Sequence, residues 1–106
     1  HGALMFQGEN VFFAPAFPLE KVVDPTGAGD TFAGGFIGYL AARHEATGEV
    51  SWEDMKQAVT VGSVMASFTC EAFGTSGLRA LTAEDTQRRW DEYTQLTACG
   101  PLVWPA

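Results

Sequence analysis

The sequence predicts an α/β fold in which a β-hairpin is followed by three helices. Two short apolar runs, residues 3–7 and 11–14, flank a turn that contains Gly8 and Asn10. The 106 residues, 46% of them hydrophobic and 18% charged, suffice for one small globular domain. Helical patterns, with their capping residues, then extend over about residues 29–46, 51–69 and 82–96.

The hairpin is predicted from its turn and from the proline that ends it. Gly8 and Asn10 are residues that commonly supply positive φ in a tight turn. The two runs are apolar rather than alternating, which suits strands covered on both faces. Pro15 cannot donate to the ladder, so we expect an extended connector over residues 15–20 and a short extended piece over residues 21–23.

The first helix has an apolar face and an unusual number of glycines. Phe32, Phe36 and Leu40 recur at i, i+4 and i+8, so they share one face. Each glycine in a helix interior costs about 1 kcal/mol relative to alanine. Close packing of a neighbouring helix is favoured over ligand contact as the compensation, and the glycines concerned are Gly34, Gly35 and Gly38.

The second helix begins with a capping box, in which Ser51 is the N-cap and Asp54 is the N3 residue. From Ala58 onward its residues are small and apolar nearly all round, which predicts a buried helix.

The third helix also begins with a capping-box sequence, from Thr82 to Asp85. Its apolar stripe is either Trp90, Tyr93 and Leu96 or Thr86, Trp90 and Tyr93. The charged side chains between them are expected on the solvent face, namely Arg88, Arg89, Asp91 and Glu92.

Composition excludes several classes of function. The net charge is −7 and the six basic residues are dispersed, which argues against nucleic acid as a partner. No apolar run approaches the roughly 20 residues of a membrane span, so no membrane partner is expected. Cys70 and Cys99 are expected to be reduced thiols, and the predicted location is cytoplasmic. No Cys/His cluster has zinc-ligand spacing.

Residues 24–30, Asp-Pro-Thr-Gly-Ala-Gly-Asp, join an extended piece to the first helix. The start of a helix has unpaired N–H groups and roughly half a positive charge, and glycines let a phosphate reach those groups. Asp30 is then placed to accept a proton from a hydroxyl beside that phosphate. The pattern is not a P-loop, because no lysine follows, and Phe32 stands where a dinucleotide fingerprint needs glycine.

This stretch, continued by Thr-Phe-Ala-Gly-Gly-Phe, closely resembles the C-terminal motif of the PfkB, or ribokinase-like, family of carbohydrate and nucleoside kinases. The resemblance implies an α/β fold and transfer of the γ-phosphoryl group of ATP, with Mg²⁺, to an alcohol group of a sugar or nucleoside. Asp30 matches the catalytic base of the family. Gly27, Ala28 and Gly29 match its anion hole.

The resemblance also implies a nucleotide and cation environment around this turn. Asp24 and Thr26 match positions that line a site for a monovalent cation such as K⁺ in many members. The loop after the second helix, including Gly74, matches a loop on the adenine and cation side. Two alternatives remain open here: an Asx turn formed by Asp24, and ordinary C-capping by Gly74 or Gly77.

The resemblance places residues 1–106 in the C-terminal part of a single ribokinase-like domain. The family's acceptor-binding residues lie upstream and have no counterpart here, so we expect this polypeptide alone to lack kinase activity. We expect a missing N-terminal segment, because the chain begins without Met. Two alternatives are a non-catalytic nucleotide- or anion-binding remnant and an assembly subunit that pairs as a homo-oligomer. The identity of the acceptor stays open.

Overall fold

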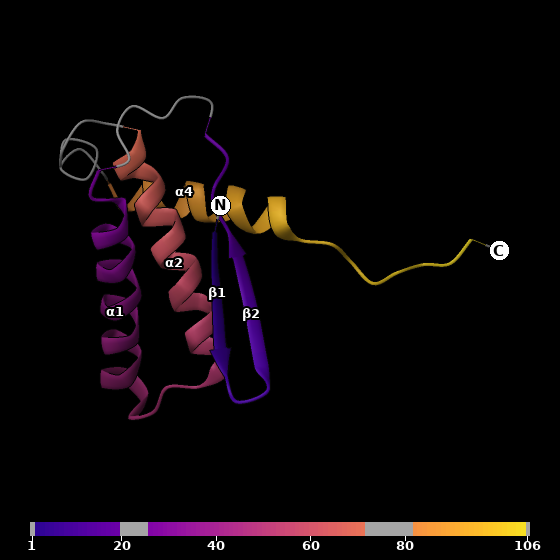
Figure 1. Ribbon diagram of the computed structural model, residues 1–106, viewed down its shortest axis with the longest axis horizontal. Helices are drawn as coiled ribbons and strands as arrows, with labels where there is room; N and C mark the ends of the chain where they lie inside the picture. Colours follow the sequence, from indigo (N-terminus) through magenta and orange to yellow (C-terminus); the bar gives the residue numbers. More distant parts are fainter. Residues whose placement is uncertain (1, 20–25, 72–81, 106) are drawn as a thin grey trace.

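The computed structural model describes residues 2–19, 26–71 and 82–105. Within these ranges the chain forms a two-stranded antiparallel hairpin followed by three helices (Figure 1), as the sequence predicts. The predicted extended piece at residues 21–23 lies outside the described residues. The elements are β1 (Gly2–Gln7), β2 (Asn10–Pro15), α1 (Ala28–Thr47), α2 (Trp52–Cys70) and α4 (Ala83–Thr97).

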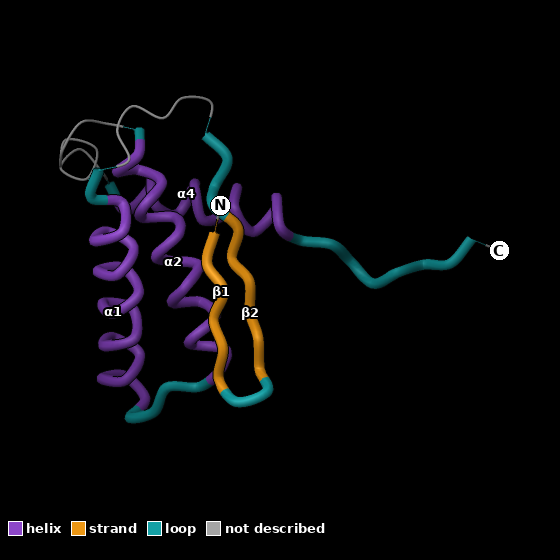
Figure 2. Tube along the Cα trace, in the orientation of Figure 1, coloured by secondary structure: helices purple, strands orange, loops and turns teal. Residues whose placement is uncertain are grey.

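A short turn joins β1 to β2 (Figure 2). The turn consists of Gly8 and Glu9, because Gln7 pairs directly with Asn10. Gly8 has φ 60°, and no non-glycine residue of the described chain has positive φ. The prediction that Asn10 supplies positive φ is therefore wrong. Asn10 is instead the first residue of β2, where the pairing with Gln7 holds it in an extended conformation.

The two faces of the hairpin differ in how well they are covered. One face has the cross-strand pairs Ala3–Ala14 and Met5–Phe12, lies against α2 and is buried or half-buried. The other face is 53–68% exposed. The prediction of strands covered on both faces is therefore wrong within the described chain, which supplies a helix to one side alone. The exposed face consists of Leu4, Phe6, Val11 and Phe13.

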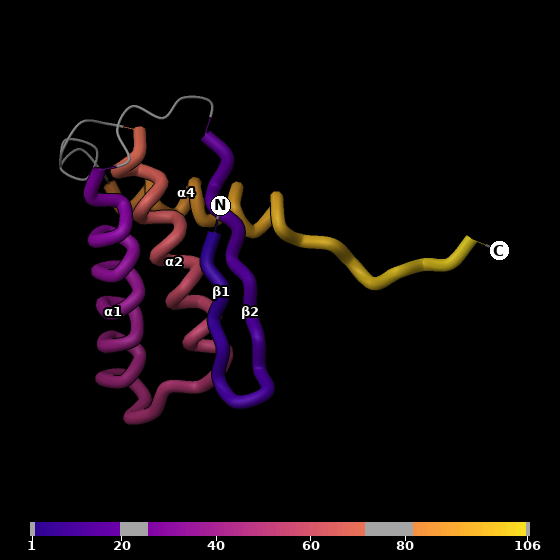
Figure 3. The backbone as a smooth tube through the Cα atoms, in the orientation of Figure 1, coloured from indigo at the N-terminus to yellow at the C-terminus, as the bar shows by residue number. Residues whose placement is uncertain are grey.

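α1 and α2 lie side by side in opposite directions (Figure 3), and their backbones approach closely at a pair of glycines. A Cβ atom on Gly35 would lie 3.3 Å from the Cα atom of Gly62. A Cβ atom on Gly62 would lie 2.8 Å from the carbonyl oxygen of Phe32. Helix packing therefore explains Gly35, as predicted. It does not explain Gly34 and Gly38, where an added Cβ atom would meet no described atom of another element within 4 Å.

α2 forms the centre of the core, as its apolar sequence predicts. α1 and the hairpin both contact it. α1, in contrast, has no buried residue, and Phe32 and Phe36 on its inner face are half-buried. The buried residues of α2 are Ala58, Val59, Thr60, Gly62, Ser63, Val64, Ser67 and Thr69.

None of the described helices combines the length and apolarity that a membrane span requires.

α4 runs across α2 (Figure 1), and the side chains of Tyr93 and Arg89 bond it to the rest of the chain. Tyr93 is 4% exposed, and its hydroxyl donates to the Pro15 carbonyl at 2.7 Å. The apolar stripe follows the Thr86, Trp90 and Tyr93 alternative, because Leu96 is 61% exposed.

The prediction that Arg89 lies on the solvent face of α4 is wrong. Its guanidinium lies 4.0 Å from the ring centre of Phe68 and 4.9 Å from that of Phe17. The same group forms an ion pair with Glu71 and donates to Ser67 Oγ at 2.9 Å. Two aromatic rings and a carboxylate thus stabilise the Arg89 charge, although helical periodicity alone predicts that this side chain faces solvent.

Candidate active site at the start of helix α1

The first turn of α1 has unpaired backbone donors. Gly27 is the N-cap residue with φ 84°, and it provides no side-chain cap. The first helical hydrogen bond runs from Thr31 N to Gly27 O at 3.0 Å. The N–H groups of Ala28, Gly29 and Asp30 precede this bond and have no acceptor within the helix. The predicted anion-hole residues therefore lie together in one turn with donors available.

The starts of α2 and α4 are closed by capping boxes, as predicted. Ser51 Oγ accepts from Asp54 N at 3.0 Å, and Asp54 Oδ2 accepts from Ser51 N at 3.0 Å. Thr82 and Asp85 make the same two bonds at 3.1 and 3.2 Å.

These bonds lower the pKa of both capping carboxyl groups. For Asp54 the main cause is the hydrogen bond from the backbone of Ser51, and Arg43 adds a smaller contribution. For Asp85 the main cause is the hydrogen bond from the side chain of Thr82. Both carboxylates are therefore engaged in holding their helices.

Asp30 is the third residue of α1, as Asp54 is of α2 and Asp85 is of α4, but it caps none of the described helices. It is exposed, and within the described part of the chain it makes no hydrogen bond or ion pair. A Cβ atom placed on Gly29 would meet no described atom within 4 Å, so space is open beside the N–H groups. A phosphate fits this turn, because donors, free space and a helix N-terminus converge there. Asp30 lies within one helical turn of those donors.

Two threonines support this turn, and neither was singled out from the sequence. Thr69 donates to Thr31 Oγ1 at 2.9 Å, and Thr31 Oγ1 donates to Gly27 O at 3.1 Å. Thr69 lies at the end of α2, so the C-terminal end of α2 holds the first turn of α1. A threonine among the apolar residues of a buried helix is the one signal in the sequence that could have indicated this contact.

The nucleotide and cation predictions concern residues that the structure describes in part. Asp24 and Gly74 lie outside the described residues, and Thr26 is an exposed turn residue. Glu71, at the end of α2, is engaged by Arg89. No group of three or more His, Cys, Asp or Glu side chains within the described ranges has the proximity to hold a metal ion. The described carboxylates thus form no cluster for Mg²⁺.

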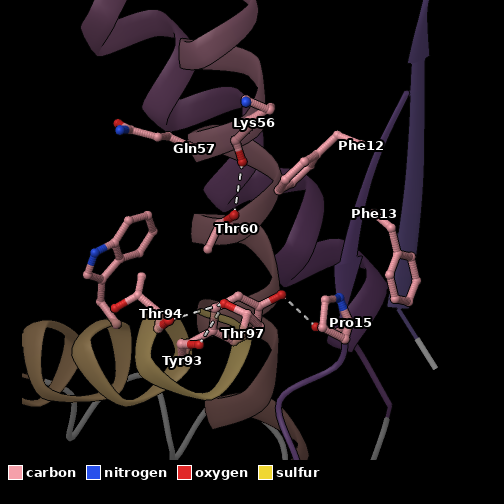
Figure 4. Close-up of a pocket in the computed structure, with 10 residues that line it drawn as sticks. Phe12, Phe13, Pro15, Lys56, Gln57, Thr60, Tyr93, Thr94 and Thr97 are labelled. Atoms are coloured by element: carbon pink, nitrogen blue, oxygen red, sulfur yellow. Dashed lines mark hydrogen bonds between the residues drawn. The ribbon is translucent and has the colours of Figure 1, made fainter. Parts of the chain in front are cut away.

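Two cavities lie at opposite ends of α2. One, of about 350 Å³, adjoins the candidate site and is lined by Ala28 and Gly29 of α1 and by Ser67 and Cys70 of α2. The other, of about 290 Å³, lies between β2, α2 and α4 near Lys56 (Figure 4). Lys56 is 13 positions before Thr69, or about 20 Å along the helix. The second cavity is therefore separate from the first turn of α1.

Comparison with known proteins assigns the chain to a family. A sequence model of the pfkB family of carbohydrate kinases matches residues 1–81. This chain belongs to the pfkB family. The matched region contains the hairpin, α1, α2 and the whole first turn of α1, whereas α4 lies beyond it.

Two curated relatives of the pfkB-family chain are nucleoside-type kinases. The cytidine kinase of Thermococcus kodakarensis is 51% identical over 45 residues, which are 40% of this chain and 16% of that protein. The nucleoside kinase of Methanocaldococcus jannaschii is 30% identical over 73 residues, which are 69% of this chain and 21% of that protein. The chain thus spans about a fifth or less of the length of these relatives.

Proposed function

We propose that this chain supplies the phosphoryl-transfer centre of an ATP-dependent pfkB-type kinase acting on a hydroxyl group of a sugar or nucleoside. The observation that carries this proposal is the contrast among helix starts. Among the described residues, the start of α1 has free donors and an unengaged Asp30, while α2 and α4 close their starts with capping boxes. Membership in a carbohydrate kinase family and two kinase relatives support the same reading.

In the proposed reaction, the turn at Gly27, Ala28 and Gly29 binds the transferring phosphoryl group. Fixed N–H donors stabilise the negative charge that is spread over its oxygens in the transition state. The acceptor hydroxyl loses its proton to the Asp30 carboxylate, and its oxygen forms a bond to the γ-phosphorus. The bond between that phosphorus and the β–γ bridging oxygen breaks, and ADP leaves.

The cofactors in this proposal are ATP and Mg²⁺, which when bound supplies positive charge to the phosphates. A monovalent cation such as K⁺ beside the turn, near Asp24 and Thr26, remains part of the proposal. So does a role for Gly74 on the nucleotide side. The names of the two relatives favour a nucleoside over a simple sugar as the acceptor.

We propose further that residues 1–106 are the C-terminal part of one ribokinase-like domain. The relatives are several times longer, and the exposed apolar faces of the hairpin and of α1 are surfaces that further polypeptide can cover. The acceptor pocket then lies mainly outside these residues. The isolated chain is accordingly expected to be inactive.

The test is an ADP-release assay with ATP, Mg²⁺ and a panel of nucleosides and sugars. It compares the complete natural polypeptide that contains these residues with the isolated 106-residue chain. The expected result is acceptor-dependent ADP release by the complete polypeptide and none by the chain. Absence of turnover with every acceptor contradicts the kinase proposal and leaves a non-catalytic anion-binding remnant. Turnover by the isolated chain contradicts the proposal of a partial domain.

A second candidate, an assembly subunit, is favoured by the exposed hairpin face alone. Leu4, Phe6, Val11 and Phe13 form a continuous apolar surface that a second copy can cover. Sedimentation of the isolated chain distinguishes the two candidates. A stable homodimer whose formation is abolished by Phe6→Lys supports assembly, and a soluble monomer excludes it.

A further inference from the structure

Thr69 differs from the other helical threonines in where its hydroxyl is directed. The hydroxyl groups of Thr47, Thr60, Thr86 and Thr97 each donate to a carbonyl four residues earlier in the chain. Thr69 instead donates across the helix interface to Thr31 Oγ1, 38 residues away, at 2.9 Å. Thr69 is 3% exposed, so water cannot readily replace this partner.

Thr31 passes this contact on to the backbone of the candidate site. Its hydroxyl accepts from Thr69 and donates to Gly27 O at 3.1 Å. Its own N–H donates to the same carbonyl at 3.0 Å. The carbonyl that begins α1 is thus held by two bonds from Thr31, and one of these is oriented by Thr69.

This arrangement takes the place of a cap. α2 and α4 fix their first turns with capping boxes, and α1 has no side-chain cap because its N-cap is glycine. A side-chain cap would occupy the donors that a phosphate needs. The two bonds from Thr31 hold the Gly27 carbonyl and use none of the N–H groups of Ala28, Gly29 and Asp30. These three groups keep a fixed direction and, among the described residues, have no acceptor.

We propose that Thr69 is a positioning residue for the anion-binding turn. It acts through Thr31, touches no substrate, and sets the orientation of donors whose misplacement by about 1 Å can cost 10²-fold in rate. The inference rests on the proposed kinase function. Its geometric part, that Thr69 orders residues 27–30, stands independently of catalysis.

The kinetic test uses the complete natural polypeptide with Thr69→Val, Thr69→Ser and Thr60→Val. Thr60 is a matched control, because it is 7% exposed in the same helix and its hydroxyl bonds within that helix. We expect Thr69→Val to lower kcat by about 10-fold or more with a smaller change in KM for ATP. Thr69→Ser, which keeps the hydroxyl, is expected to retain kcat within about twofold. Thr60→Val is expected to retain kcat in the same way.

Equal kcat values for Thr69→Val and Thr60→Val overturn the proposal. A Thr69→Ser variant as slow as Thr69→Val also overturns it, because keeping the hydroxyl would then not preserve the rate. If Thr69→Val does not fold, Thr31→Val breaks the same contact from α1 and also removes the hydroxyl bond to Gly27 O, so it must lower kcat by at least the same expected factor. If both single variants fold, the Thr31→Val, Thr69→Val double variant must have a kcat no lower than that of the slower single variant, since the two hydroxyls act as one unit.

Amide hydrogen exchange separates this proposal from the proposed function. In Thr69→Val, the Thr31 amide, which donates to Gly27 O, is expected to exchange faster than in Thr60→Val, whether or not any acceptor is turned over. Inactivity of the unaltered polypeptide with this exchange difference present refutes the kinase function and retains the structural role of Thr69. Unchanged exchange at the Thr31 amide refutes the positioning role.

Discussion

α1 has 20 residues and no buried one, whereas its neighbour α2 has 19 residues, several of them fully buried. The first turn of α2 is closed by Ser51 and Asp54, and the first turn of α1 has no side-chain cap. α2 is contacted by α1, by the hairpin and by α4, and its first turn is capped. α1 contacts α2 along one face, whereas its outer face and its first turn are mostly exposed. The difference fits the proposal that α2 is the support and that the start of α1 binds the ligand.

The largest effect is expected from Asp30→Asn in the complete polypeptide. Removing a general base typically costs about 10²–10⁴-fold in rate, so kcat should fall by that order while the Kd for ATP changes little. Asp85→Asn is the matched control, because Asp85 has the same third position in α4 but serves as a cap. Steady-state kinetics and ATP titration check the pair. Equal kcat for the two variants removes the catalytic role of Asp30.

The next effect concerns the faces of the two helices and is measured by urea unfolding of the 106-residue chain. Gly62→Ala in α2 places a methyl group 2.8 Å from the Phe32 carbonyl and should destabilise the chain by about 1–3 kcal/mol. Gly38→Ala in α1 meets open space and should stabilise it by up to about 1 kcal/mol through helix propensity. Destabilisation by Gly38→Ala would show that the outer face of α1 is not open, and stabilisation by Gly62→Ala would show that the two helices do not pack closely at Gly62.

A smaller effect is expected at the cap of α2. Ser51→Ala removes the acceptor for Asp54 N and should cost about 1 kcal/mol in the free energy of unfolding. Thr82→Ala should give a similar loss at α4. Chemical denaturation of each variant measures the change. A loss below about 0.3 kcal/mol at both positions would mean that the capping boxes contribute little to stability and that the contrast with α1 is weaker than proposed.

The smallest expected effect is a dependence of stability on acid pH. The folded-state pKa values of Asp54 and Asp85 lie below their ordinary 3.8. The unfolded chain therefore binds protons first, and the contribution of both carboxylates is present above pH 3.8 and lost as the pH falls through the folded values. Unfolding curves between pH 3 and pH 6 should show this decline. The decline should be reduced in an Asp54→Asn, Asp85→Asn double variant, and an identical decline would contradict the assignment.

The sequence predicts the elements of this fold well because their signals are local. The turn at Gly8, the capping boxes and the small apolar run from Ala58 each act within a few residues of the chain. The contiguous part of the candidate site is equally local, since residues 27–30 form one helical turn. The motif and the structure therefore both place the backbone donors and Asp30 in the same turn, and the roles of these residues stay predictions.

What the sequence does not reveal depends on contacts between distant residues. Periodicity assigns Arg89 to solvent, but Phe17, Phe68 and Glu71 come from other elements to enclose it. Gly34, Gly35 and Gly38 have similar sequence surroundings in α1. Of these three, only Gly35 packs against α2, because Gly62 lies opposite it. Thr69 reaches Thr31 only after α1 and α2 have paired. Local pattern carries no information on such pairings.

In the proposed function, the start of α1, and not that of α2, binds the transferring phosphoryl group. Amide chemical shifts and hydrogen exchange of the complete polypeptide with ADP, Mg²⁺, acceptor and aluminium fluoride, a mimic of that group, test it most directly. The expected result is large shifts and slowed exchange at Ala28, Gly29 and Asp30, with Glu53 and Asp54 at the start of α2 unchanged. Binding of the mimic with no change at residues 28–30 would contradict the account.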